Sequence, residues 1–368
     1  MVAILSDGPL LVQAHATAAG QQVVEVILNA PDALNALNGD MVDLLLEHVP
    51  AWEADEDVIA IVMRGTGSKA FCAGGDIRQL YHEINKGNLD IGEKFFNHEY
   101  TMDLMLHRLA TPLIVWGSGY VIGGGMGLLQ GAAIRVGTHS SRLAMPEVTI
   151  GLFPDVGASY FLRQVPDDLG LFLGLTGAML NGTDGRQLGL LDALLDDEDY
   201  QHVMQALQTM PRQSQRNTLE QAKEQIRSLE SKASSDAHAS NLHIHRPSII
   251  EALNQPSLTS IVANLALLKG QDKWLDRAIQ TMEQGSPTSL HLFYRAFNAG
   301  FTNVADALLQ EYIMGVNAAR LGEFKEGVRA LLIDKDRNPN WRYATVEDTP
   351  TAWIDQFFIT DNVAPAHF

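Results

Sequence analysis

The chain has 368 residues, of which 46% are hydrophobic and 19% charged, an ordinary composition for a protein with a sizeable buried core. This length allows one large domain with a substantial appendage, or two domains. The formal charge of -18 argues against nucleic-acid and anionic-membrane partners, because both of those surfaces are themselves negative.

Cysteine use and the two ends of the chain bear on its location. Cys72 is the single cysteine, so an intramolecular disulfide is excluded and a reducing compartment is expected. No apolar run reaches the roughly 18 residues of a membrane span. The first twenty residues lack a basic signal region, and the final APAHF is not a peroxisomal signal. These features predict a cytoplasmic protein.

Short apolar runs and amphipathic stripes alternate along the first part of the chain. The runs predict strands at residues 23–28, 58–63, 113–116 and 134–137, and an amphipathic stripe predicts a helix at 41–52. Strands separated by helices indicate an α/β fold. From about residue 169 the pattern becomes helical, with a helix at 212–232 and a polar linker at 234–240. The sequence therefore predicts an α/β core at 1–200 and a helical C-terminal region at 201–368.

Two glycine-rich segments each follow a predicted strand and open a helix. They are FCAGGD at 71–76 and GGGMG at 123–127. Glycine lets the backbone approach a ligand closely, and the unpaired N–H groups at a helix start point towards it. One N–H group from each segment would form an oxyanion hole for a carbonyl oxygen. The alternative for either segment alone is a tight turn between a strand and a helix.

Other catalytic motifs are missing from the sequence. There is no serine-nucleophile elbow, no zinc-binding His-Glu helix motif and no phosphate-binding Walker loop. His238, His243 and His245 lie close together but have no carboxylate or cysteine at ligand spacing, so a solvated loop is favoured over a metal site. Cys72 is expected to be a packing residue. We therefore expect chemistry that needs neither a metal nor a cofactor.

The segments FCAGGDI, GYVIGGGMGL and LAMPEVTIGLFPDVGASYFL together resemble the enoyl-CoA hydratase/isomerase (crotonase) superfamily across the predicted core. The resemblance implies a crotonase-like spiral of ββα units, an acyl-CoA substrate and oxyanion donors at Ala73 and Gly124. It also implies that the backbone of Ala73, Gly75 and Asp76 holds the adenine of coenzyme A. Basic residues that could meet the coenzyme A phosphates are Lys69, Arg78, Lys335 and Arg337, and the alternative for each of them is a solvated surface charge.

The sequence departs from the hydratase pattern at two positions. Hydratases have a glutamate in the form GGGxE, and here that position is Gly127. The later glutamate is kept as Glu147, and Asp155 replaces a small residue. Losing one carboxylate and gaining another resembles the 3-hydroxyisobutyryl-CoA hydrolase branch, as do SPTSL at 286–290 and EGVRALLIDKDRNPNW at 326–341. The resemblance implies hydrolysis of this valine-degradation intermediate, although a 3-hydroxypropionyl group is not distinguished from it.

Three carboxylates are the candidates for catalysis and substrate binding. Glu147 can attack the thioester to form a mixed anhydride, or it can activate water as a general base. Asp155 is expected to bind the 3-hydroxyl group or to orient Glu147 and water, with a helix N-cap as the alternative. Glu99 lies on an apolar helical stripe and matches a glutamate that reaches the acyl pocket in this branch. The alternative for Glu99 is a side chain that extends to water.

Two other functions are open from the sequence. One is an enoyl-CoA hydratase or isomerase that uses Glu147 alone, which the glycine at position 127 disfavours. The other is an acyl-CoA-binding protein with a lapsed site, which the retained carboxylates and glycine loops disfavour. Relatives often assemble through C-terminal helices, so a homo-oligomer is possible.

Overall fold

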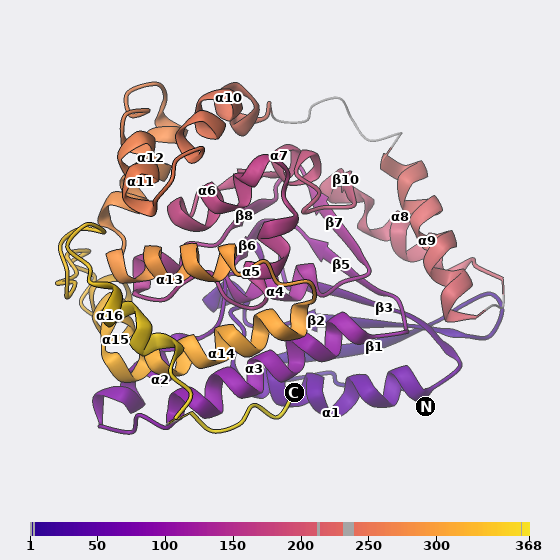
Figure 1. Cartoon of the computed structure of the whole chain (residues 1–368). Helices are drawn as coiled ribbons and strands as arrows, with labels where there is room; N and C mark the ends of the chain where they lie inside the picture. Colours follow the sequence, from indigo (N-terminus) through magenta and orange to yellow (C-terminus); the bar gives the residue numbers. More distant parts are fainter. Residues whose placement is uncertain (1, 3, 212–213, 231–238, 362) are drawn as a thin grey trace. The chain divides into compact units, whose positions relative to one another are not determined.

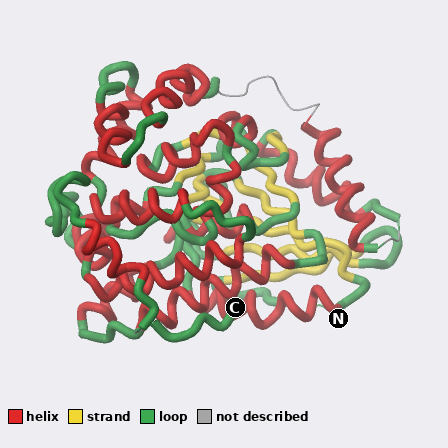
Figure 2. The backbone as a smooth tube through the Cα atoms, in the orientation of Figure 1, coloured by secondary structure: helices red, strands yellow, loops and turns green. Residues whose placement is uncertain are grey.

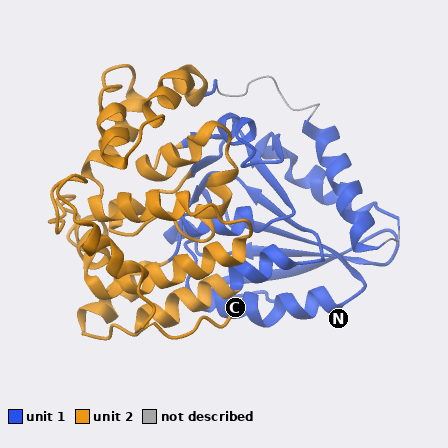
Figure 3. Ribbon diagram, in the orientation of Figure 1, with its two compact units in different colours: residues 1–75, 102–143, 180–240 blue, residues 76–101, 144–179, 241–368 orange. Residues whose placement is uncertain are grey.

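The computed structural model describes residues 2, 4–211, 214–230, 239–361 and 363–368 (Figure 1). Most of the predicted linker, including His238, lies outside these residues. The chain divides into two compact units that interleave along the sequence, whereas the predicted halves follow one another (Figure 3). Unit 1 comprises Met1–Gly75, Met102–Leu143 and Leu180–Ser240, and unit 2 comprises Asp76–Thr101, Ala144–Met179 and Asn241–Phe368.

Unit 1 contains a six-stranded sheet, seen among the strands of Figure 2. Its order is β1 (Leu10–Ala16), β2 (Gln22–Leu28), β3 (Val58–Gly65), β5 (Leu113–Gly117), β7 (Ile134–Thr138) and β10 (Ala193–Leu195). β1 pairs with β2 in antiparallel orientation, and the other four pairs are parallel. All four predicted strands are confirmed, as is the α/β class.

Helices α8 (Tyr200–Gln208) and α9 (Gln215–Glu230) pack against this sheet. The buried cluster joins Val62 and Val136 of the sheet to Leu207 of α8 and Ile226 of α9. Removing these apolar side chains from water drives the association of the helices with the sheet. α9 confirms the helix predicted at 212–232, and α1 (Gly39–Ala54) confirms the helix predicted at 41–52.

A second, smaller sheet carries the two glycine segments. Its order is β4 (Ala70–Cys72), β6 (Tyr120–Ile122), β8 (Arg142–Ala144) and β9 (Leu180–Asn181). β4 and β6 are parallel neighbours. The first glycine segment follows β4, and the second follows β6 and begins α4 (Gly124–Gln130). Unit 1 also contains α7 (Gly182–Gln187) and the last part of α3 (Ile91–Arg108).

Unit 2 is helical, which confirms the predicted helical character of the C-terminal region (Figure 1). No helix among the described residues is long and apolar enough to cross a membrane. The helices are α2 (Ile77–Asn85), the first part of α3 (Ile91–Arg108), α5 (Ala158–Phe161), α6 (Leu169–Thr176), α10 (Asn241–Leu253), α11 (Leu258–Ala266), α12 (Lys273–Gln284), α13 (Pro287–Asn298), α14 (Val304–Leu321), α15 (Glu323–Val328) and α16 (Thr351–Asp355).

The SPTSL segment is the start of α13. Ser286 is the N-cap, its hydroxyl accepts the N–H of Ser289 at 3.1 Å, and Pro287 occupies the first helical position, where its missing N–H group costs nothing. The N–H group of Ser286 donates to the carbonyl oxygen of Val148 at 2.9 Å. This end of α13 is therefore fixed to the turn that follows Glu147.

Candidate active site

The two glycine segments of unit 1 approach each other closely. A β-carbon at Gly125 would lie 2.3 Å from the carbonyl oxygen of Cys72, and one at Gly74 would lie 3.4 Å from that of Ile122. Since real β-carbons almost never come within 3.0 Å of such an atom, glycine is required at position 125. The parallel pairing of β4 with β6 brings the segments together. Cys72 is fully buried, as expected of a packing residue.

Each of these segments has an N–H group that is available to a ligand. Gly124 is the first residue of α4, where backbone N–H groups have no intrahelical acceptor. Within the described residues, neither Gly124 N–H nor Gly75 N–H donates to a backbone acceptor. The N–H group of Ala73 instead donates to the carbonyl oxygen of Leu34 at 3.1 Å. This bond corrects the assignment of Ala73 as an oxyanion donor, because its N–H group is already paired.

Three carboxylates come together in unit 2. Glu99 on α3, Glu147 at the start of a 3-10 helix (Glu147–Ile150) and Asp155 before α5 are 6%, 6% and 5% exposed. Burial raises the pKa of each carboxyl group, and the charge of Asp155 raises the pKa of Glu99 and Glu147 further. The resulting pKa is about 8 for Glu99 and about 6 for Asp155. Glu99 is thus buried, and the alternative expectation, that its side chain extends to water, is wrong.

Asp155 is held by a tyrosine that the sequence did not single out. The hydroxyl of Tyr100 on α3 donates to Oδ2 of Asp155 at 2.6 Å, and Tyr100 is fully buried. This bond opposes the effect of burial and lowers the pKa of Asp155. The cap alternative for Asp155 is wrong, since the N–H groups at the start of α5 donate to Glu311 instead.

Glu147 keeps one carboxylate oxygen free. Its Oε2 is buried and has no hydrogen-bond partner among the residues that the structure describes. Burial, followed by the negative charge of Asp155, raises the pKa of Glu147 well above its ordinary value. Once ionised, this oxygen can attack a carbon atom or accept a proton from water.

The comparisons with known proteins can now be set beside this geometry. Residues 23–358 match the family model described as Enoyl-CoA hydratase/isomerase. The chain belongs to this family. Among its relatives, "3-hydroxyisobutyryl-CoA hydrolase, mitochondrial" of Xenopus tropicalis is 33% identical over 90% of this chain and 85% of the relative. "3-hydroxyisobutyryl-CoA hydrolase 1" of Arabidopsis thaliana is also 33% identical, over 90% of this chain and 87% of the relative.

Solved structures show the crotonase fold of the family. An enoyl-CoA hydratase from Rhodobacter sphaeroides superposes with a TM-score of 0.79 at 29% identity, covering 94% of this chain and 96% of that structure. A carnitinyl-CoA dehydratase from Mycobacterium thermoresistibile superposes with a TM-score of 0.80 at 28% identity, covering 95% of this chain and 97% of that structure. The crotonase-like α/β fold expected from the sequence is confirmed.

Asp76, which the resemblance places at the coenzyme A site, and His245 of the histidine cluster both have structural contacts of their own. Asp76 is the N-cap of α2, and its side chain accepts the N–H of Arg78 at 3.3 Å. His245 of the histidine cluster pairs with Asp272 and stacks on Trp274. In the described part of the chain, no group of three or more His, Cys, Asp or Glu residues is placed to hold a metal ion.

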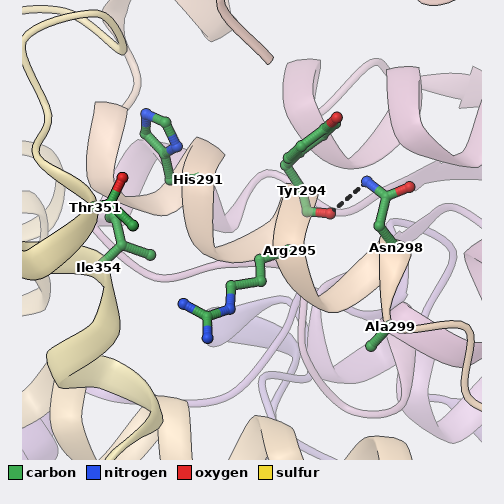
Figure 4. Close-up of a pocket in the computed structure, with 7 residues that line it drawn as sticks. All are labelled: His291, Tyr294, Arg295, Asn298, Ala299, Thr351 and Ile354. Atoms are coloured by element: carbon green, nitrogen blue, oxygen red, sulfur yellow. Dashed lines mark hydrogen bonds between the residues drawn. The ribbon is translucent and has the colours of Figure 1, made fainter. Parts of the chain in front are cut away.

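A pocket on α13 and α16 contains none of these groups (Figure 4). Arg295, which lines it, pairs with Asp355 at 2.6 Å and lies over the ring of Phe358. A second pocket, on unit 1, is lined by Arg135 and Arg186, which are paired with acidic side chains. Neither pocket is lined by Glu99, Glu147 or Asp155, so both lie apart from the three candidate carboxylates.

Proposed function

We propose that this protein hydrolyses 3-hydroxyisobutyryl-CoA to 3-hydroxyisobutyrate and coenzyme A. The observation that carries the proposal is Glu147, a buried carboxylate with a free oxygen, together with Gly127 where hydratases have a second glutamate. The names of the relatives from X. tropicalis and A. thaliana support the same substrate.

In this reaction the thioester oxygen becomes negative as the carbonyl carbon turns tetrahedral. We assign its stabilisation to the N–H groups of Gly75 and Gly124, in place of the pair Ala73 and Gly124. Collapse of the intermediate breaks the C–S bond, and coenzyme A leaves as a thiolate. The oxygen that enters comes from water, so the net reaction adds one water and releases one acid and one thiol.

Glu147 delivers that oxygen, and both of its routes remain open. In one route its carboxylate forms a mixed anhydride that water then cleaves. In the other route it takes a proton from an attacking water. Both routes use the ionised form, which the raised pKa disfavours in the ligand-free protein. Turnover should therefore increase as the pH rises through the pKa of Glu147.

Asp155 and Glu99 are assigned to the acyl group. With a pKa of about 6, Asp155 is mostly ionised at pH 7 and can accept a hydrogen bond from the 3-hydroxyl group. Glu99, with a pKa of about 8, is mostly protonated at pH 7, so its carboxyl group can donate a hydrogen bond. The 3-hydroxyl group can donate a hydrogen bond to Asp155 and accept one from Glu99, so this pair of side chains matches a hydroxylated acyl chain.

Coenzyme A is polyanionic, and the chain carries a charge of -18, so its phosphates require local cations. We propose Lys335 and Arg337 for this role. Both have left-handed backbones, with φ of 58° and 54°, in a loop organised by Arg329, which binds Asp334 at 2.6 Å and Asp336 at 2.7 Å. Because these acidic groups are engaged by Arg329, Lys335 and Arg337 remain available to phosphate. Gly75 and the backbone beside it, with Ala73 and Asp76, are proposed for the adenine.

The reaction as proposed uses no metal and no other cofactor, because coenzyme A is part of the substrate. We keep a homo-oligomer and a cytoplasmic location as proposals. The relative from X. tropicalis carries the word "mitochondrial" in its name, which describes that protein.

Free-thiol release from a panel of acyl-CoA esters tests the proposal. The panel contains 3-hydroxyisobutyryl-, 3-hydroxypropionyl- and isobutyryl-CoA at equal concentration. We expect kcat/KM to be highest for a hydroxylated ester. Comparing the first two compounds distinguishes the 3-hydroxyisobutyryl from the 3-hydroxypropionyl group, which the sequence does not. No thiol release from either hydroxylated ester would refute the proposed function.

A further inference from the structure

A carboxylate on α14 binds the turn that follows Asp155. Glu311 is fully buried, and its Oε2 accepts the N–H of Gly157 at 2.7 Å. Its Oε1 accepts the N–H of Ser159 at 2.9 Å and the hydroxyl of Ser159 at 2.6 Å. One side chain, more than 150 residues further along the chain, thus accepts three hydrogen bonds from two residues of the turn, Gly157 and Ser159.

The turn itself has an unfavourable backbone conformation. Val156 has a φ of 53° and Gly157 a φ of 88°, both in the left-handed region. A β-branched residue such as valine adopts that region only where its surroundings enforce it. The N–H groups of Gly157 and Ser159 in this turn converge on one acceptor, the carboxyl group of Glu311.

Asp155 lies directly before this turn and could compete with Glu311 for its N–H groups. Its carbonyl oxygen already accepts the N–H of Ala158 at 2.9 Å, and aspartate is a preferred residue for capping a helix start. Asp155 would therefore be a natural acceptor for the N–H groups of Gly157 and Ser159. Its carboxylate instead accepts from Tyr100, because Glu311 occupies those donors.

We infer that Glu311 is a positioning residue: by capping the turn, it keeps the carboxylate of Asp155 on Tyr100 and available to the acyl group. The inference rests on the proposed function, since it acts through the assigned role of Asp155. Without Glu311, the two freed N–H groups recruit the carboxylate of Asp155 and remove it from the substrate.

A double-mutant cycle on substrate preference tests this inference. The measured quantity is the ratio of kcat/KM for 3-hydroxyisobutyryl-CoA to that for isobutyryl-CoA. Glu311→Ala and Asp155→Asn should each lower this ratio about tenfold, the scale of one lost charged hydrogen bond. In the Asp155→Asn background, Glu311→Ala should lower the ratio no further, because both changes remove the same contact.

Two further variants separate positioning from general stability. Glu311→Gln keeps one acceptor oxygen for the turn, so it should lower the ratio by less than Glu311→Ala, and it serves where the alanine variant does not fold. Asn317→Ala is the matched control on α14, since the Asn317 side chain is buried and donates to the carbonyl oxygens of Phe357 and Ile359 at 3.1 and 3.0 Å. It should lower the melting temperature and leave the ratio unchanged.

A crystal structure of Glu311→Ala gives a readout that does not depend on the substrate. The carboxylate of Asp155 should have turned to the N–H groups of Gly157 and Ser159. A carboxylate that stays on Tyr100, an unchanged ratio in the Glu311 variants, or additive losses in the double mutant would each overturn the inference. A wild-type protein without any preference for the hydroxylated ester refutes the proposed function instead.

Discussion

The candidate functional groups of the two units differ in kind. Those of unit 1 are the backbone N–H groups of Gly75 and Gly124, whose positions follow from the pairing of β4 with β6. Those of unit 2 are the ionisable side chains of Glu99, Glu147 and Asp155, whose charges depend on burial and on one another. The difference teaches that the backbone donors need only correct geometry, whereas the carboxylates also need control over their protonation.

The largest effect is expected from removing a backbone donor in unit 1. Gly124→Pro deletes the N–H group at the first position of α4, where proline is favoured in helices. Loss of one oxyanion donor should lower kcat by about 100- to 1,000-fold. Stopped-flow or steady-state measurement of thiol release gives the rate, and far-UV circular dichroism checks that the fold is kept. A folded variant with nearly full turnover would show that this N–H group does not act on the oxyanion.

In unit 2 the corresponding change is Glu147→Gln, which preserves shape and removes the ionisable group. It should lower kcat at least about 100-fold, the lower end for a positioned acid–base group. Glu323→Gln is the control, because Glu323 is equally buried in unit 2 but accepts from Ser286 at 2.6 Å and from the N–H of Arg342 at 3.0 Å. If both variants lost the same activity, the loss would report on structure rather than chemistry.

A smaller effect, of about tenfold, is expected from Tyr100→Phe. The Tyr100 hydroxyl lowers the pKa of Asp155, so its removal should raise that pKa above about 6 and leave less carboxylate at pH 7. The acidic limb of the pH–rate profile for 3-hydroxyisobutyryl-CoA should then move to higher pH. Tyr312→Phe, which loses one bond to the carbonyl oxygen of Ala364, should leave the limb in place.

The smallest effect concerns stability and Glu99. Its pKa is raised from 4.5 to about 8 in the folded protein, so between these values the folded state binds more protons than the unfolded state. Stability therefore falls as the pH rises through this window. Glu99→Gln should remove that loss and raise the melting temperature by about 2–4 °C at pH 8, with less gain at pH 5. An equal gain at both pH values would contradict the raised pKa.

The strands of the main sheet were only partly predictable from the sequence. Four strands of the main sheet were predicted because each is a mainly apolar run, interrupted only by Glu25 in β2 and Arg135 in β7. β1 was missed because LLVQAHA mixes apolar and polar residues more evenly. β9 and β10 were missed because they have two and three residues. The closeness of the glycine segments depends on the pairing of β4 with β6, two short strands that the sequence did not predict, and it was expected only from the resemblance to the crotonase superfamily.

The partners of the site residues were not predictable. Leu34, which occupies the N–H group of Ala73, belongs to an earlier turn, and nothing in the motif indicates it. Tyr100 and Asp155 are 55 residues apart. Glu311 lies on an otherwise ordinary amphipathic helix. The motif identified Asp155 as a site residue, but a side chain cannot be assigned to function rather than to a helix cap without its distant partners.

The central claim is that this member of the hydratase/isomerase family cleaves thioesters and does not hydrate double bonds, because position 127 is glycine. The most direct test measures one preparation with two substrates: thiol release from 3-hydroxyisobutyryl-CoA, and loss of the enoyl absorbance of crotonyl-CoA. We predict a kcat/KM for thiol release at least about 100-fold above that for hydration, since hydration lacks one positioned acid–base group. Efficient hydration of crotonyl-CoA with little free thiol would contradict the account and establish a hydratase.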